Sequence, residues 1–458
     1  MSESPPLEFR GGSVGALLPL VAFLAGVGTL GLAGAPDERG FWPVLLGCLA
    51  MGLLLARDST AYAEAVLRGM SRPIVMLMIL AWLLAGVLGA LIQQSGFVDS
   101  LVGVAARAGV SGGGFVVTSF LIAAAVSTST GTSLGTLIIC VPLLYPASGS
   151  LGADPVWLIG AILAGATFGD NISPVSDTTV ASATTQEADI GGVVRSRLRY
   201  ALPAAAAAAV VYALVGAHVS QGVAGAGERG AAPSLLPLVM MAPPALTIAC
   251  LLRRAHLVTS LMFGILSALV IGLLAGLFSP ADLLHLDRES FVATGIVLEG
   301  MERGVGISVF TLLLMGLVGG LEATGLMDRF LERAERGART PARAEWSIFG
   351  AISAAVMLTT HSVVAILAVG PLARDIGPEH GISRYRRANI LDVSVCTYPF
   401  LLPFFIPTIL AASLTASGAE AGVPRVSALD AGLANLHSWG LLIVLLMALA
   451  TGRGRSAG

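Results

Sequence analysis

The chain has 458 residues, of which 55% are apolar and only 12% are charged, and its mean hydropathy is +0.85. So few charges cannot cover the surface of a water-soluble protein of this length, which excludes a soluble enzyme, a secreted disulfide scaffold and a nucleic-acid-binding protein. The net charge is −2, and all 26 basic residues are arginine. Apolar runs of about 20 residues recur along the chain, so we expect an all-α polytopic membrane protein.

Uninterrupted apolar runs predict the simple membrane-spanning helices. They lie at residues 13–33, 40–56, 73–93, 201–218, 234–252, 258–278, 304–321 and 435–451. The polar segment 1–12 lacks the basic start and the small-residue cleavage site of a secretory signal. We therefore expect it to be a cytoplasmic tail that precedes an uncleaved first span.

Two further apolar segments have a polar centre. In residues 113–146 the sequence VSTSTGTSLGT leaves two arms of about 14 residues, which as helices are each about 21 Å long. The hydrocarbon core of a bilayer is about 30 Å thick, so neither arm spans it alone. The pattern predicts a re-entrant hairpin with its tip near the midplane. Residues 345–371 have the same pattern and predict a second hairpin.

Two apolar segments are interrupted by glycine or proline. Residues 156–185 contain GDNISPVSDTT, and residues 385–416 contain TYPFLLPFFIPT. Unwound backbone is tolerated at membrane depth only where other parts of the protein or a polar cavity satisfy its hydrogen bonds. We therefore predict two discontinuous helices whose breaks lie at the midplane.

The arginine distribution tests this topology. If each hairpin returns to its side of entry and each broken helix crosses once, 20 of the 26 arginines fall on one face. If the hairpin segments cross instead, the arginines divide equally between the two faces. Since arginine accumulates on the cytoplasmic side, the first topology is favoured. It predicts ten crossings and places both termini in the cytoplasm.

The chain also contains an internal repeat. VLRGMSR at residues 66–72 returns as VLEGMER at 297–303, and QSGFVD at 94–99 returns as ATGLMD at 323–328. From the second match onward, an offset of 229 residues holds without a gap through both hairpin tips and both helix breaks. Each single match is weak, but matches at one offset on every polar interruption indicate a duplication.

The repeats are predicted at 13–220 and 234–451, and residues 452–458 are predicted to be a second cytoplasmic tail. Each repeat holds five crossings and one re-entrant hairpin, and an odd number of crossings makes the second copy inverted in the membrane. Inverted repeats with broken helices are typical of secondary transporters, which bind their substrate between the repeats. The alternatives are a duplicated helical bundle with no transport role and a passive channel.

The first broken helix contains the most informative polar group. It consists of Asp170, Asn171, Ser173, Asp177, Thr178 and Thr179. A carboxylate at the centre of a bilayer costs about 2.5–3.5 kcal/mol, so two of them are expected to surround a bound species. Oxygen ligands suit a hard cation, and the same carboxyls can bind protons, because burial beside a like charge favours the neutral form. The alternative is that one aspartate merely caps the second half of the helix.

The hairpin tips supply further candidates. Those expected to face the acidic site are Ser129, Thr130, Thr132, Ser133, Thr359, Thr360, His361 and Ser362. The hydroxyls of these residues could instead satisfy the backbone of their own hairpin. His361 is either a proton relay or a satisfied buried histidine.

Asp392, in the second broken helix, is a possible second acidic site. Arg386 and Arg387 offer a structural salt bridge as the alternative. No nucleotide-binding motif and no catalytic constellation is present, so we expect neither an enzyme nor a cofactor. The segments assigned to mid-depth contain no arginine for a substrate carboxylate, which favours cation exchange.

GDNISPVSDTT and STSTGTSLGT resemble the corresponding stretches of the NhaC family of sodium/proton antiporters, and the resemblance covers roughly residues 13–450. It implies sodium at Asp170 and Asp177, with transported sodium and protons as the partners. It also implies a homodimer in the bacterial inner membrane. RRANILD at residues 386–392 departs from the best-known members. The family also includes malate/lactate exchangers, so the alternative is a coupled transporter of a small organic anion or amino acid.

Overall fold

Nearly all regular secondary structure in this chain is helical. The computed structural model describes residues 6–32, 38–110, 112–174, 176–219, 234–253, 255–287 and 292–455. The exceptions in those ranges are an antiparallel pair of strands, β1 (His285–Asp287) and β2 (Val292–Thr294), and an isolated bridge between Phe9 and Ala56. Seven helical segments of the described chain are long and apolar enough to cross a membrane. The chain is therefore a multi-pass, all-α membrane protein, as predicted.

Helices lie at every position predicted for a simple span. They are α1 (Gly12–Leu32), α2 (Trp42–Leu55), α4 (Pro73–Gln94), α10 (Ile190–Val219), α11 (Ala242–Leu252), α12 (Leu257–Leu274), α14 (Ile296–Glu322) and α21 (Leu436–Thr451). α10 begins 11 residues before the predicted span, because arginine is a good helix former and the basic stretch 195–199 continues the helix. Residues 1–5 and 456–458 of the predicted tails, and residue 220 at the predicted end of the first repeat, lie outside the described ranges.

Shorter helices connect these spans. They are α3 (Ser59–Met70), α5 (Phe97–Arg107), α13 (Pro280–Leu283), α15 (Leu326–Gly337) and α20 (Ala428–Leu433). α3 begins where Asp58 accepts hydrogen bonds from the backbone N–H groups of Thr60 and Ala61, each at 2.9 Å. These helices were not predicted, because they are too short or too polar for an apolar-run criterion.

The four interrupted segments each divide into two helices. In the first half of the chain these are α6 (Gly112–Thr130), α7 (Ser133–Leu144), α8 (Pro155–Ile172) and α9 (Asp177–Thr185). In the second half they are α16 (Pro341–Thr359), α17 (Ser362–Glu379), α18 (Arg384–Val395) and α19 (Ile406–Leu414). The interruptions therefore lie where the glycine, proline and serine or threonine clusters predicted them.

The offset of 229 residues reappears in the helix boundaries. It separates the first residues of α6 and α16, of α7 and α17, of α8 and α18, and of α9 and α19. The predicted length of the hairpin arms was wrong, however. α6 and α16 contain 19 residues each, about 28 Å of helix, which is close to the hydrocarbon thickness. The length of the arms therefore does not by itself require re-entrant hairpins.

α4 and α14 cross in close contact. An added Cβ atom on Gly86 of α4 would lie 2.0 Å from the carbonyl oxygen of Gly300 on α14. The same atom on Gly304 would lie 2.9 Å from the backbone of Trp82. Only glycine permits two backbones to approach this closely. The pairing of Trp82 with Gly304 and of Gly86 with Gly300 makes the two helices antiparallel.

Both ends of this crossing carry a polar contact. Arg72, just before α4, pairs with Glu322 at the end of α14. Arg303 near the start of α14 donates a 2.7 Å hydrogen bond to Gln93 near the end of α4. Arg72 and Arg303 are equivalent in the repeated sequence motif, and Gln93 and Glu322 are 229 residues apart. The two contacts are thus the same contact with the two halves of the chain exchanged.

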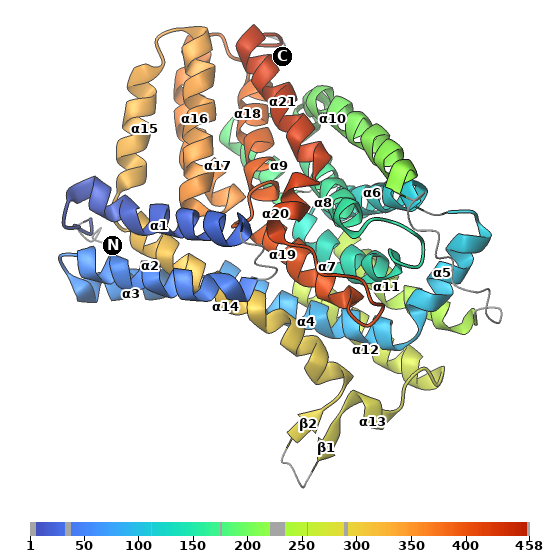
Figure 1. The fold of residues 1–458 in the computed structure, drawn as a ribbon. Coiled ribbons are helices and arrows are strands. Elements are labelled where there is room, and N and C mark those ends of the chain that lie inside the picture. Colours follow the sequence, from blue (N-terminus) through green and yellow to red (C-terminus); the bar gives the residue numbers. More distant parts are fainter. Residues whose placement is uncertain are drawn as a thin grey trace.

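α8 lies at the centre of the buried core, and it packs against α6, α7, α10, α19 and α21. In Figure 1 α4 and α14 lie in the lower half of the view, whereas α16, α18 and α21 stand in the upper half. Large apolar side chains are exposed on the outer helices, such as Val14 on α1 at 76%. A lipid environment covers such side chains, as a bilayer-spanning protein requires.

Candidate ion-binding site

A cavity of about 300 Å³ lies where the interrupted helices meet. Polar residues that line it are Thr132, Ser133, Asp170, Ser176, Asp177, Thr178, Thr360, His361 and Ser362. Its apolar wall includes residues of α4 and α12, among them Trp82 and Leu257. Both predicted hairpin tips and both helix breaks therefore contribute to one cavity.

Four helices of the interrupted segments begin at this cavity. Ser133, Asp177, Ser362 and Ile406 are the first residues of α7, α9, α17 and α19, and all four line it. The first N–H groups of a helix have no partner within the helix and carry partial positive charge. The cavity therefore combines carboxylate groups with backbone N–H groups that favour negative charge.

Asp170 is the buried carboxylate of the cavity, with 9% of the residue exposed. Its Oδ1 accepts a 2.6 Å hydrogen bond from Ser176 Oγ, and its Oδ2 accepts a 3.3 Å hydrogen bond from the N–H of Ser133. Neither donor is charged, and within the described ranges no arginine or histidine forms an ion pair with Asp170. The structure thus leaves the charge of Asp170 without a cationic partner.

Asp177 and the second tip complete the lining. Asp177 is the first residue of α9 and is more exposed than Asp170. His361 precedes α17, and its Nδ1 has no hydrogen-bond partner among the described residues. Thr360 ends α16 in a left-handed conformation with φ of 52°, which turns the chain between α16 and α17.

Some predicted site residues lie outside the cavity lining. Ser129 is exposed, while the hydroxyls of Thr130 and Thr359 donate to the carbonyls of Val126 and Ala355 in their own helices. Ser173 Oγ donates 2.7 Å to the carbonyl of Thr128 and so ties the break of α8 to the end of α6. Several hydroxyls near the tips therefore donate to backbone carbonyl groups, which is the alternative role that the sequence allowed for them.

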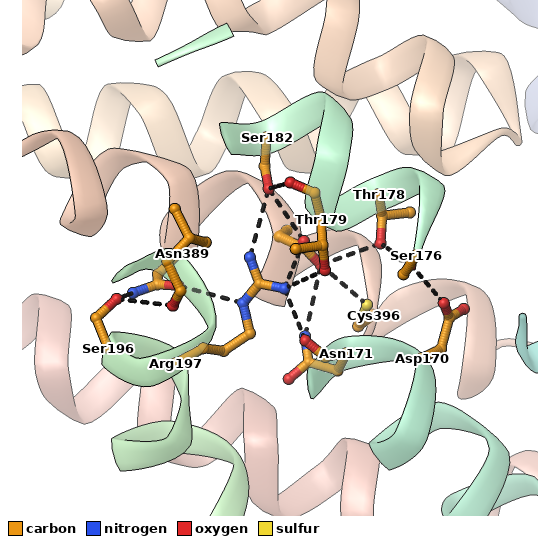
Figure 2. A network of polar contacts seen from close by, with 12 residues as sticks. Asp170, Asn171, Ser176, Thr178, Thr179, Ser182, Ser196, Arg197, Asn389 and Cys396 are labelled. Atoms are coloured by element: carbon orange, nitrogen blue, oxygen red, sulfur yellow. Dashed lines mark hydrogen bonds and ion pairs between the residues drawn. The ribbon is translucent and has the colours of Figure 1, made fainter. Parts of the chain in front are cut away.

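Asn171 and Thr179 point instead toward a second buried acid, Asp392 on α18. Asn171 Nδ2 approaches Asp392 Oδ1 at 3.5 Å, and Thr179 Oγ1 accepts a 2.8 Å hydrogen bond from Arg197. Arg197 of α10 also pairs with Asp392 Oδ2 at 2.7 Å, and both side chains are fully buried. Figure 2 shows Asp170 at one end of this polar network and Arg197, Asn389 and Ser196 at the other.

This ion pair corrects two expectations. Asp392 pairs with Arg197 and not with Arg386 or Arg387, whose side chains instead contact Glu345 and Gln186. Arg197 does lie beside the helix breaks, although the sequence predicted no arginine at that depth. These three arginines are buried inside the protein, so they are not exposed topology signals.

The spacing between Asp392 and the two arginines already indicated that the predicted salt bridge was unfavourable. Arg386 and Arg387 precede Asp392 by six and five residues, whereas side chains on one helix meet at a separation of three or four. The pair with Arg197 spans 195 residues of sequence, and no local pattern identifies such a contact. Ser182 and Asn389 were not predicted for the same reason, because their partners Asp392 and Ser196 lie on other helices. Cys396 lies four residues after Asp392, a helical spacing that could have indicated their contact.

Comparison with known proteins places the chain among transporters. The sequence model of the Na+/H+ antiporter family matches residues 18–217 and 231–420. The Na(+)/H(+) antiporter NhaC of Bacillus subtilis is 27% identical over 238 residues, 48% of this chain and 51% of that protein. The protein of that name from Alkalihalophilus pseudofirmus is 25% identical over 288 residues, 60% of this chain and 61% of its own.

A third relative has a different name. The malate-2H(+)/Na(+)-lactate antiporter of Bacillus subtilis is 34% identical over 102 residues, 22% of each chain. The chain therefore spans about half the length of the first curated relative that it matches, and less of this one. The family model, by contrast, matches most of the sequence in two blocks, one in each predicted repeat. The chain belongs to the Na+/H+ antiporter family.

Proposed function

We propose that this protein exchanges sodium for protons across a membrane and that Asp170 binds the two ions alternately. The observation that carries the proposal is a buried carboxylate that lines a cavity and has no cationic partner among the described residues. A charge held at that depth without compensation is unfavourable, so it favours either a bound cation or a proton. Family membership and the two NhaC relatives support sodium as the cation.

Sodium would be held by oxygen atoms at the break of α8. The carboxylate of Asp170, the hydroxyls of Ser176 and Thr178, and the carboxylate of Asp177 all line the same cavity. Hydroxyl and carboxylate oxygens can replace the hydration shell of a hard cation. A proton on Asp170 removes the charge that attracts sodium, so binding of the two ions is mutually exclusive. Exchange follows if the empty, charged site does not move across the membrane.

Inverted repeats are part of this proposal. The contacts Arg72–Glu322 and Arg303–Gln93 are related by exchange of the two halves, and they lie at opposite ends of two antiparallel helices. A two-fold axis in the membrane plane relates inverted repeats in this way. The predicted repeats 13–220 and 234–451, the ten crossings and the cytoplasmic termini are all consistent with it. We further propose that the protein acts as a homodimer in the bacterial inner membrane, as its resemblance to the NhaC family implies.

We also propose that the two predicted hairpins are re-entrant, and the position of their tips supports this rather than the length of their arms. The turns after α6 and α16 both line a cavity that is also lined by the breaks of α8 and α18. A hairpin tip can meet a mid-membrane break only if the tip also lies at mid-depth. Movement of the tips relative to α4 and α14 would then expose the cavity to one side at a time.

Coupled transport of a small organic anion is the second candidate. The four helix N-termini favour negative charge, and about 300 Å³ exceeds the space that one dehydrated sodium ion needs. One relative is named for malate and lactate. In this case Asp170 would hold sodium while the N–H groups bind a substrate carboxylate.

Purified protein in liposomes with an internal pH dye separates the two candidates. Sodium, potassium, malate and neutral amino acids are added in turn as outward gradients. Sodium alone should drive proton movement if the first proposal is correct. A proton signal that requires malate or an amino acid would favour the second candidate, and no signal with any of them would contradict both.

A further inference from the structure

The guanidinium of Arg197 occupies an oxygen cage beside the candidate ion site. One of its nitrogens, Nη1, lies 2.7 Å from Asp392 Oδ2, 2.7 Å from the backbone carbonyl of Asn171 and 2.8 Å from Thr179 Oγ1. The three oxygens are a carboxylate, a carbonyl and a hydroxyl, and they come from α18, α8 and α9. This set of oxygen types is the one that proteins use to hold hard cations.

The rest of the guanidinium is also satisfied. Nε donates to Asn389 Oδ1 at 3.2 Å, and Nη2 donates to Ser182 Oγ at 3.4 Å. Asn389 is itself held by a 2.7 Å hydrogen bond from its Nδ2 to Ser196 Oγ. Arg197 and Asp392 are both fully buried, so no solvent screens their interaction.

Asp392 is surrounded in the same way. Its Oδ1 accepts from Thr178 Oγ1 at 3.3 Å and from the thiol of Cys396 at 3.4 Å, and its Oδ2 accepts from Ser182 Oγ at 3.1 Å. The carboxylate therefore has several neutral donors and one cation. Among the described residues, Arg197 is the only full positive charge in contact with this carboxylate.

We propose that this cage is a second cation-binding site and that its cation is the chain's own Arg197. The inference rests on the proposed function of the Asp170 cavity and extends it. A tethered guanidinium cannot leave, so the cage stays neutral in every step of a transport cycle. Asp170 is then the carboxylate whose cation exchanges, and Arg197 fixes how many cations the buried acids can release.

Two neighbouring hydroxyl groups lie between the two sites. Ser176 Oγ donates to Asp170 Oδ1 at 2.6 Å, Thr178 Oγ1 donates to Asp392 Oδ1 at 3.3 Å, and the two hydroxyl oxygens are 3.1 Å apart. A change of charge at the cage is therefore only two hydroxyl groups away from Asp170. If Asp392 were neutral, the positive charge of Arg197 would oppose sodium at Asp170.

Chemical rescue tests the cage directly. Arg197→Ala empties it, and the melting temperature of the purified variant is measured in detergent with millimolar methylguanidinium chloride or with choline chloride at equal ionic strength. We expect methylguanidinium to raise the melting temperature of Arg197→Ala, with a shift that grows with concentration, and to leave the wild type unchanged. The control is Arg197→Ala/Asp392→Asn, which has no charge to compensate and should show no shift. Absence of rescue, or equal rescue in the control, would overturn the proposal.

A second measurement covers the case in which Arg197→Ala does not fold. Binding of radioactive sodium is compared between the wild type, Asp392→Asn and Arg197→Ala/Asp392→Asn. The isolated charge of Arg197 should weaken sodium binding at least tenfold in Asp392→Asn, and the double variant should recover it. Wild-type binding by Asp392→Asn, or no recovery in the double variant, would contradict the proposal. Absence of sodium binding in the wild type would instead contradict the proposed function.

Discussion

Asp170 and Asp392 are two buried aspartates on equivalent broken helices, but their surroundings differ. Asp170 has two neutral hydrogen-bond donors and lines a cavity, whereas Asp392 has an arginine at 2.7 Å and is packed on all sides. Among the described residues no cation pairs with the first carboxylate, whereas Arg197 pairs with the second. A mid-membrane acid therefore indicates a transported ion only when its own chain provides no cation for it.

The repeat makes this difference more informative. Asp392 lies on α18, the first half of its broken helix, and Asp170 lies near the end of α8, the first half of the other broken helix. The residue 229 positions before Asp392 is Leu163, so the two acids are not copies of one another. The two halves therefore have helix breaks at matching positions but carry their buried acids at different ones.

Replacing Asp170 should have the largest effect. Asp170→Asn keeps the size of the side chain and one acceptor oxygen but removes the charge, so we expect sodium-dependent proton movement in liposomes to fall to the level of empty vesicles. The control is Glu332→Gln, which removes an exposed acid on α15. Exchange by Asp170→Asn at even a tenth of the wild-type rate would contradict the role assigned to this residue.

Arg197→Lys tests the fixed pair. Lysine keeps the positive charge but lacks the fork that reaches Asp392, Asn171 and Asn389 together. We expect the unfolding free energy to fall by about 1–3 kcal/mol, the cost of buried groups left without partners. Thermal unfolding in detergent measures it, with Arg199→Lys, at an exposed arginine on the same helix, as the matched substitution. A loss of equal size in both variants would mean that the cage has no special role.

Ser176→Ala and Ser182→Ala test the two acids separately. The first removes a hydroxyl donor to Asp170, and the second removes a hydroxyl donor to Asp392. A hydrogen bond to a charged group contributes about 1.5–3 kcal/mol. Ser176→Ala should therefore raise the sodium concentration for half-maximal exchange by about tenfold or more. Ser182→Ala should lower thermal stability with little change in that concentration. The reverse assignment of effects would show that the roles of the two acids are exchanged.

Tyr385→Phe should have the smallest effect. Its hydroxyl donates to the exposed Asp189 in the loop between α9 and α10, and together with the N–H of Gly192 it lowers the pKa of that carboxyl. A lowered pKa adds stability above the ordinary pKa of aspartate, and this stability is lost as the pH falls through the lowered value. The wild type should therefore melt slightly higher than Tyr385→Phe at pH 7, and the difference should vanish at strongly acidic pH. A difference that grows on acidification would have the wrong sign.

Much of the fold could be predicted from local sequence. Apolar runs placed the spanning helices, and glycine, proline and hydroxyl clusters placed the breaks that begin at Ser133, Asp177 and Ser362. Each of these features depends on residues close together in the chain. The meeting of the hairpin tips and the helix breaks was also expected, because polar interruptions at membrane depth need one another or a polar cavity as partners.

The fixed ion pair could not be predicted in this way. Arg197 stands in a basic stretch that resembles an ordinary cytoplasmic end of a helix, and only tertiary packing brings it to Asp392. Exposure to solvent or lipid cannot be read from the sequence for a charged residue near a helix end. For the same reason, the burial of Arg386 against Glu345 could not be predicted.

The most direct test of competition between sodium and protons at Asp170 is whether sodium binding releases protons. Purified protein in detergent is placed in weak buffer with a pH indicator, and sodium chloride or choline chloride is added. The wild type should release protons only with sodium, in proportion to the sodium that it binds, and Asp170→Asn should release none while it still folds. Equal release from the wild type and Asp170→Asn, or sodium binding without any release, would contradict competition between the two ions at Asp170.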